Sequence, residues 1–139
     1  MRVLFLVAGL TLGAGPAMAQ TVGDCDGWQA NARNVDWSDP TRTFANGAIR
    51  LVGLDTEEPA AAAFHIMVLY PDPEEQFLEC RLVSLGADVG FGGISLARAE
   101  AAYDPARGLT VSVPGTSPEG EALVIAFTIN RATGQVSVP

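Results

Sequence analysis

Two five-residue motifs with the same turn chemistry constrain the fold of this chain more than any other feature. Asp104 opens the first motif and Gly108 closes it, while Asn130 and Gly134 hold the same two places in the second. An Asp or Asn side chain can bond the backbone of a tight turn, and glycine supplies the left-handed residue that ends it. A segment of alternating apolar and polar residues follows each motif. The motifs therefore predict hairpins between adjacent antiparallel strands.

Further turn signals recur at short intervals along the chain. Asn46 and Gly47 lie between two extended segments, which predicts a type I′ hairpin turn because both residues tolerate positive φ. The segment 117–120 predicts another turn, with proline fixing φ at its second position. The segment 121–130 that follows alternates between apolar and polar residues, as a strand with one buried face does.

The segment 94–103 is ambiguous between helix and strand. Its alanines, together with the spacing of Leu96, Ala99 and Tyr103, permit a helix. We favour a strand because the hairpin motif at 104–108 follows it directly. With this segment included, the chain has about eight or nine short strands. The predicted fold class is all-β, as an antiparallel β-sandwich or a small barrel.

An apolar run from Ala61 to Tyr70 is interrupted by one polar residue, His65. A strand that is apolar on both faces is usually covered on both, so this run predicts a central, buried strand. The short acidic loop 71–76 ends it, and the segment 77–84 predicts a neighbouring strand.

The first residues have the organisation of an export signal. Arg2 precedes a short apolar core, and small residues at Ala17 and Ala19 suit a signal peptidase. We predict cleavage after Ala19, which divides the chain into a signal peptide at 1–19 and one β-domain at 20–139. The apolar core is too short for a membrane span. The predicted location is periplasmic or secreted.

The acidic composition argues against several classes of partner. Without Arg2, the predicted mature chain has seven arginines, no lysine and 16 acidic residues, for a net charge of 7 − 16 = −9. Nucleic acids and anionic lipids require clustered basic residues, and these arginines are scattered singly. We therefore expect neither nucleic acid nor a membrane surface as partner.

The two cysteines, Cys25 and Cys80, are predicted to form one disulfide bond. Cysteines of exported proteins usually pair, and these lack the CxxC spacing of a redox or metal motif. A bridge that closes a loop of this length stabilises a small domain by about 4 kcal/mol in the chain-entropy model.

The residue types that carry catalysis and metal binding are sparse. A histidine base needs a positioned partner, and no G-x-S-x-G motif accompanies His65, so we interpret it as a structural residue, either in the core or on the less buried side of its strand. Asp24 with Asp26 and the segment 72–75 are acidic, but neither has the ligand spacing of a calcium loop. One histidine and two bridged cysteines do not make an ordinary zinc site. We expect no catalytic residue, no metal and no cofactor.

Three aromatic residues are the candidates for contacting a partner. Phe91 lies in a glycine-rich segment, 86–93, where it could be a mobile, exposed anchor or could plug the end of the sheet. Trp28 and Trp37 lie in the polar N-terminal region and present the same choice between a lid on the core and a recognition surface.

The sequence favours a non-enzymatic exported β-domain that binds a protein or envelope partner. A more specific version is a periplasmic inhibitor of a basic hydrolase such as lysozyme, which rests on size, charge and architecture alone. A third reading is a small-ligand carrier or small enzyme that uses the interior of a barrel, although the bulky central strand favours a filled core.

Overall fold

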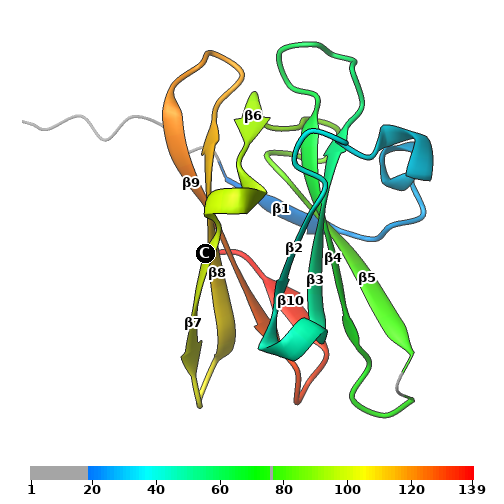
Figure 1. Cartoon of the computed structure of the whole chain (residues 1–139), viewed down its shortest axis with the longest axis vertical. Helices are drawn as coiled ribbons and strands as arrows, with labels where there is room; N and C mark the ends of the chain where they lie inside the picture. The colour runs from blue at the N-terminus through cyan, green and yellow to red at the C-terminus, as the bar shows by residue number, and fades with distance from the viewer. Residues whose placement is uncertain (1–18, 76) are drawn as a thin grey trace, which may run out of the picture.

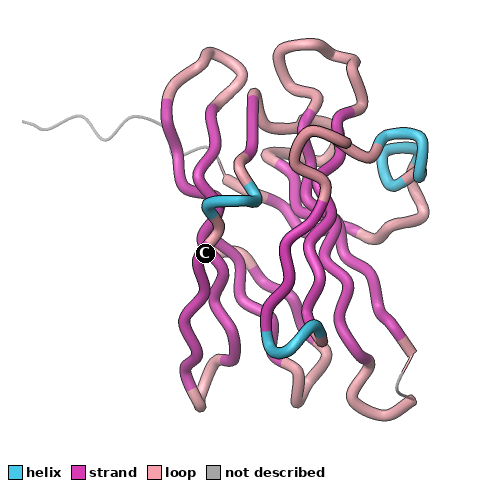
Figure 2. The backbone as a smooth tube through the Cα atoms, viewed as in Figure 1, coloured by secondary structure: helices cyan, strands magenta, loops and turns pink. Residues whose placement is uncertain are grey.

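The computed structural model describes residues 19–75 and 77–139, and within them ten strands form two antiparallel sheets (Figures 1 and 2). The predicted signal peptide, 1–19, lies outside the described residues except for Ala19. The strands are β1 (Thr21–Gly23), β2 (Thr41–Phe44), β3 (Ile49–Asp55), β4 (Phe64–Pro71), β5 (Leu78–Ser84), β6 (Gly93–Ile94), β7 (Glu100–Asp104), β8 (Gly108–Thr116), β9 (Ala122–Asn130) and β10 (Gln135–Ser137).

The first five strands of the chain form one sheet, and the last five form the other. The N-terminal sheet has the strand order β1-β5-β4-β3-β2, and the C-terminal sheet has the order β10-β9-β8-β6, with β7 also paired to β8. The sheets face one another across the core, so the architecture is a β-sandwich (Figure 1). Among the described residues, no helix has the length and hydropathy that crossing a membrane requires.

Alternate residues of the central strands fill the space between the sheets. The period of two in a strand sends every second side chain to the core. Each of these side chains contributes about 1.5–3 kcal/mol when it is fully buried. The fully buried members on the three longest strands are Ile66, Val68, Tyr70, Val111, Val113, Ile125, Phe127 and Ile129.

The predicted central strand is confirmed as β4, third of five in its sheet. It begins at Phe64 because the alanines before it form a turn, in which Ala62 N–H donates to the Pro59 carbonyl at 2.8 Å. Its two faces differ more than the apolar run suggests. Met67 and Leu69, which point away from the core, are only partly buried.

Both Asx-to-glycine motifs form the predicted hairpins. The Oδ1 atoms of Asp104 and Asn130 each accept hydrogen bonds from backbone N–H groups two and three residues on, at 2.7–3.3 Å. Gly108 and Gly134 take positive φ, 111° and 70°. The side chains thus satisfy turn donors that the strands leave unpaired.

The hairpin at Asn46 and Gly47 is confirmed, but its predicted type I′ turn is wrong. Phe44 pairs with Ile49, so four residues separate the strands instead of two. Ala45 has positive φ (52°), as do Asn46 (55°) and Gly47 (83°). The longer left-handed loop includes the 3-10 segment η3 (Ala45–Gly47).

The segment 94–103 is not one strand. The short strand β6 is followed by the 3-10 helix η4 (Leu96–Arg98) and then by β7. Both β6 and β7 pair with the same edge of β8. The helical turn between them places Leu96 and Ala99 in the core, at 0% and 1% exposure, and this burial interrupts the strand.

The connections between strands gather at the two ends of the sandwich (Figure 2). The loop end, at the top of Figure 1, comprises residues 24–40, 55–63, 85–93 and 117–121, which include the end residues Asp55 of β3 and Gly93 of β6. The turn end, at the bottom, comprises residues 45–48, 72–75, 105–107 and 131–134.

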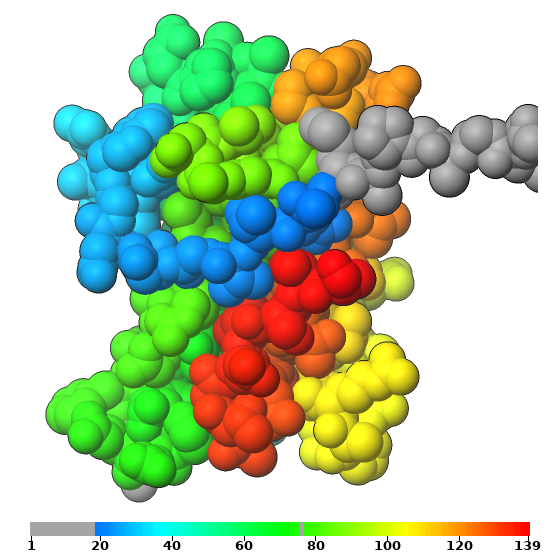
Figure 3. Space-filling model, turned by 180° about the vertical axis from the view of Figure 1, so that it is seen from behind, coloured from blue at the N-terminus to red at the C-terminus, as the bar shows by residue number. Residues whose placement is uncertain are grey.

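The N-terminal segment joins the two sheets along one side. The Gln20 side chain acts as a substitute for a strand: its Nε2 donates to the Val124 carbonyl, and its Oε1 accepts from Ala126 N–H, both at 3.2 Å. Figure 3 shows the blue N-terminal segment crossing this side above the red β10. The free upper part of the β9 edge is thereby covered.

Candidate functional site

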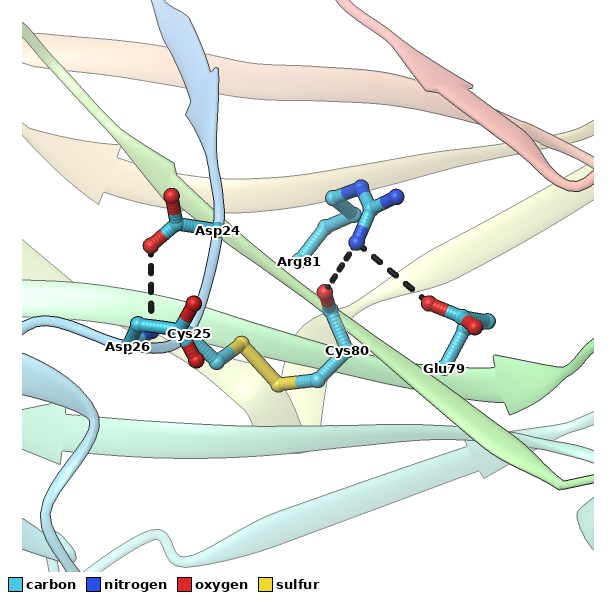
Figure 4. The surroundings of a disulfide bond; sticks show 6 residues. All are labelled: Asp24, Cys25, Asp26, Glu79, Cys80 and Arg81. Carbon is cyan, nitrogen blue, oxygen red and sulfur yellow. Dashed lines mark hydrogen bonds and ion pairs between the residues drawn. A yellow bond between two sulfur atoms is a disulfide. The ribbon is translucent and has the colours of Figure 1, made fainter.

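The Cys25–Cys80 disulfide is confirmed, with its Cα atoms 5.9 Å apart (Figure 4). Cys80 lies on β5, next to Arg81, whose Nη1 donates to the Cys80 carbonyl at 2.7 Å. Cys25 follows β1, in a turn where Asp26 N–H donates to Asp24 Oδ1 at 3.0 Å. The bridge therefore fixes the start of the long connection 24–40 to the outer face of the N-terminal sheet.

We call residues 24–40 the tryptophan segment, and two buried polar side chains hold its first half in place. Asn34 Nδ2 donates to the carbonyls of Trp28 and Gln29, at 3.0 and 3.1 Å. Gln29 Nε2 reaches Asp88 Oδ1 in the neighbouring loop at 3.5 Å. Gln29 and Asn34 are 6% and 8% exposed, so the hydrogen bond between Asn34 and the Gln29 carbonyl is shielded from water.

The second half of the tryptophan segment is attached to β3. Asp36 N–H donates to the Gly53 carbonyl at 2.8 Å, and Gly53 N–H donates to the Pro40 carbonyl at 2.9 Å. The Asp39 carboxylate accepts from Ala97 N–H, 3.1 Å from each oxygen. The second half of the segment is therefore bonded to β3 of the N-terminal sheet and, at Asp39, to η4.

On this secured backbone, both tryptophans face solvent. Trp28 is 52% exposed and Trp37 is 80% exposed. The predicted alternative of a lid over the core is therefore wrong for Trp37. For Trp28 it can apply only to the half of the residue surface that is buried. Large aromatic side chains of this exposure are the type that protein interfaces bury.

Phe91 is fully buried, so the expectation of an exposed anchor is wrong, and the alternative of a core residue is confirmed. Phe64 N–H donates to the Phe91 carbonyl at 3.1 Å, and Phe91 N–H donates to the Phe64 carbonyl at 2.7 Å. This bridge attaches the segment at Phe91 to β4, at the point where the chain crosses towards β8. The Phe91 ring packs between the sheets.

The glycines around Phe91 allow close backbone contact. A Cβ at Gly90 would lie 2.6 Å from the Phe64 carbonyl oxygen and 2.9 Å from His65 Nε2. A Cβ at Gly92 would collide with the Ser117 carbonyl. The glycine-rich segment is therefore a tight crossing between the sheets.

His65 is buried, 2% exposed, and pairs across the strands with Ser84. His65 Nδ1 lies 2.7 Å from Ser84 Oγ, and burial lowers the pKa of the imidazole below its ordinary value. The imidazole is therefore neutral at pH 7. Among the described residues, no carboxylate bonds to this pair, so the third member of a nucleophilic triad is missing. His65 is thus a buried structural residue, but it lies on the face of β4 that it shares with Met67 and Leu69, opposite the core face.

Ser84 also lines a surface hollow of about 370 Å³, which it shares with Gln29, Asp24 and Asp88. Its lining comes from β1, β5, the tryptophan segment and the loop at Asp88, and it includes the apolar residues Val22 and Leu82. In residues 19–75 and 77–139, no three His, Cys, Asp or Glu side chains are grouped so that they could hold a metal ion. The acidic turn at Asp72 instead bonds its own backbone, at Glu74 and Glu75.

The fold concentrates acidic residues at one end, which the linear sequence does not reveal. The four segments of the loop end contain ten of the 16 acidic residues and only one arginine, Arg33, for a formal charge of −9. The rest of the described chain holds six acidic residues and six arginines. This concentration of charge could be predicted only once the pairing of the strands is known, because the four segments are far apart in sequence.

The two tryptophans and the acidic loop end are thus the features available for recognition at this end of the molecule. Searches of protein-family models, of curated proteins and of solved structures gave no match to this chain.

Proposed function

We propose that this protein is an exported, non-catalytic β-sandwich that binds a protein partner through Trp28 and Trp37. The observation that carries the proposal is the exposure of both side chains, 52% and 80%, on a segment fixed by a disulfide and by buried hydrogen bonds. A fixed backbone lowers the entropy lost on binding, and tryptophan contributes more interface energy than most residues.

The charge of the loop end supports a basic partner surface. The tryptophan segment itself carries four aspartates and one arginine. A surface of this sign increases the rate of association with a positively charged protein and disfavours an acidic one. Binding should therefore weaken as salt concentration rises.

A basic hydrolase is the partner class that the charge favours within this proposal. An inhibitor acts by occluding an active site and needs no catalytic group of its own, which agrees with a His65 buried away from solvent. A titration of the mature protein against a basic lysozyme tests this version. Unchanged lysozyme activity at micromolar excess would remove it and leave the general proposal standing.

Site-specific photo-crosslinking tests the general proposal. A photoreactive phenylalanine analogue replaces Trp37 in one variant and Val124 in a control, and both variants are expressed in the native cell envelope. Val124 is also an exposed apolar residue, at 61%, but it lies on β9. We expect one protein species to be captured from position 37 and not from position 124.

Affinity measurements then decide whether the tryptophans carry the binding. With the captured protein purified, the variant Trp28→Ala/Trp37→Ala should bind at least about tenfold more weakly than the Val124→Ala control. Equal affinities, or the same capture from both crosslinking positions, would contradict the proposal.

A further inference from the structure

The strand β7 has a free edge at the turn end of the C-terminal sheet. It pairs with β8 on one side, and no described strand pairs with its other side. All five residues, Glu100–Asp104, are exposed. Alternate backbone N–H and C=O groups of such an edge point outwards and are available to another strand.

The core-facing side of β7 is uncovered as well. Ala101 is opposite Val111, and Tyr103 is opposite Leu109, so these side chains share the face on which Val111 enters the core. Tyr103 is nevertheless 72% exposed. The N-terminal sheet reaches the start of this strand, where Arg42 Nη2 of β2 donates to the Ala99 carbonyl at 3.3 Å, but no strand of that sheet pairs with β7. One strand position is therefore unoccupied beside β7.

A hollow of about 490 Å³ lies next to this position, between the two sheets. Tyr103, Leu109 and Ile129 line it from the C-terminal sheet, and Ala45 and Pro71 line it from the N-terminal sheet. Figure 3 shows the hairpin turns of this end separated by grooves. Apolar side chains of an added strand would have this hollow to enter.

We propose that β7 is a docking edge for an extended, antiparallel strand of a partner protein, and that this strand carries two basic residues four positions apart. Glu100 and Asp104 lie at the two ends of β7 and on the same face. Basic residues directly opposite them form favourable cross-strand pairs. The two positions opposite Ala101 and Tyr103 face the hollow and take apolar side chains. The partner strand therefore has the pattern basic–apolar–any–apolar–basic.

A second copy of this chain is a poor occupant of the same edge. The one antiparallel register that pairs all five residues of two β7 strands is centred on Ala102. It places Glu100 opposite Asp104 at both ends, and like charges directly opposite one another destabilise a sheet. The acidic ends thus disfavour self-association while they favour a basic strand. This proposal does not depend on the tryptophan surface.

A labelled peptide with the central sequence Arg-Val-Thr-Val-Arg is the probe, and binding is followed by fluorescence anisotropy and by the amide resonances of residues 100–104. We expect saturable binding with a dissociation constant below about 1 mM. Replacing both arginines of the peptide by glutamate should weaken binding about tenfold or more, because two attractive pairs become repulsive. The Trp28→Ala/Trp37→Ala variant should bind the peptide as the wild type does.

Backbone methylation tests whether the contact is a strand pairing. Two peptides carry N-methyl groups on alternate residues, one on each of the two alternating sets. Only one set of amides points to β7 in an antiparallel pair, so one peptide should lose binding and the other should keep it. Equal behaviour of the two peptides would overturn the proposal.

A charge exchange tests register and direction. The variant Glu100→Lys should bind the original peptide several-fold more weakly and should recover with Arg-Val-Thr-Val-Glu, since the last residue is opposite position 100 in an antiparallel pair. Glu-Val-Thr-Val-Arg should not restore binding, and Glu119→Lys at the loop end serves as the unaffected control. No binding at 1 mM, equal binding of the glutamate peptide, or a β7-dependent homodimer in sedimentation that Tyr103→Ser abolishes would each overturn the inference.

Discussion

The loop end and the turn end close the same sandwich with different lengths of chain. At the loop end, long connections bond to one another: Gly90 N–H donates to the Ala62 carbonyl at 2.9 Å, and Gly92 N–H donates to the Thr116 carbonyl at 2.8 Å. At the turn end, short hairpin turns stand apart around a hollow of about 490 Å³. Connections that cross between the sheets cover the core at the loop end, whereas the short hairpin turns leave a hollow beside the core at the turn end.

Phe91, buried near the loop end, and Tyr103, exposed near the turn end, should differ most in what their removal costs in free energy of unfolding. Phe91→Ala should lower the free energy of unfolding by about 3–5 kcal/mol, because it leaves a cavity between the sheets. Tyr103→Ala should change it by no more than about 0.5 kcal/mol, since its side chain is mostly in water. Urea unfolding of both variants measures the difference. Similar losses would show that the turn end is as closed as the loop end.

Removal of the disulfide should destabilise the protein by about 4 kcal/mol. The bridge joins residues 55 positions apart, so the unfolded chain gains much freedom without it. Cys25→Ser/Cys80→Ser compared with the wild type in urea gives the value. We also expect amide exchange to increase at residues 26–34 before it does at residues 131–134. Uniform acceleration at both ends would contradict a local role.

Acid should weaken the loop end through His65. Burial lowers the pKa of this imidazole in the folded state, so below about pH 6.5 the unfolded chain binds a proton that the folded chain does not. The free energy of unfolding then falls as the pH falls, by at most about 1.4 kcal/mol per pH unit from this group. Unfolding at pH 7 and 5.5 should show a smaller decrease for His65→Gln than for the wild type. Parallel decreases would assign the acid sensitivity to carboxylates.

Tyr70 provides the matching test at the turn end. Its hydroxyl donates to the Gly134 carbonyl at 3.0 Å, which ties β4 to the last hairpin. Tyr70→Phe should cost about 1 kcal/mol, because it removes one hydrogen bond and leaves the ring in place. Amide exchange of residues 131–135 should increase more than that of the loop end. No local change would show that the hairpin is held by its backbone pairing alone.

Features set by neighbouring residues could be predicted from the sequence, and features set by the crossing of distant segments could not. The hairpins after Asp104 and Asn130 follow from local turn chemistry, and the disulfide follows from two cysteines in a chain whose first residues predict export. Glycines beside Phe91 are compatible with mobility or with close packing, and only the contact of Gly90 with the Phe64 carbonyl decides between them. The free edge of β7 could not be predicted, because it depends on η4 interrupting the segment 94–103, which the sequence predicts as one strand.

The candidate site was predicted in part. The sequence predicts Trp28 and Trp37 as contact residues. Their exposure depends on the disulfide and on Asn34, whose role as a buried donor to two carbonyls has no local sequence pattern. The acidic character of the loop end could not be predicted, because its residues are distributed over four separate segments.

The position of Gln20 has a consequence for the order in which the chain completes its fold. Thr21 of β1 pairs with Ser84 of β5, and the Gln20 side chain bonds to Val124 and Ala126 on β9. Contacts of such long sequence separation form late, since much of the chain must be ordered first. We therefore expect β1, which precedes the other described strands along the chain, to be among the last to be secured.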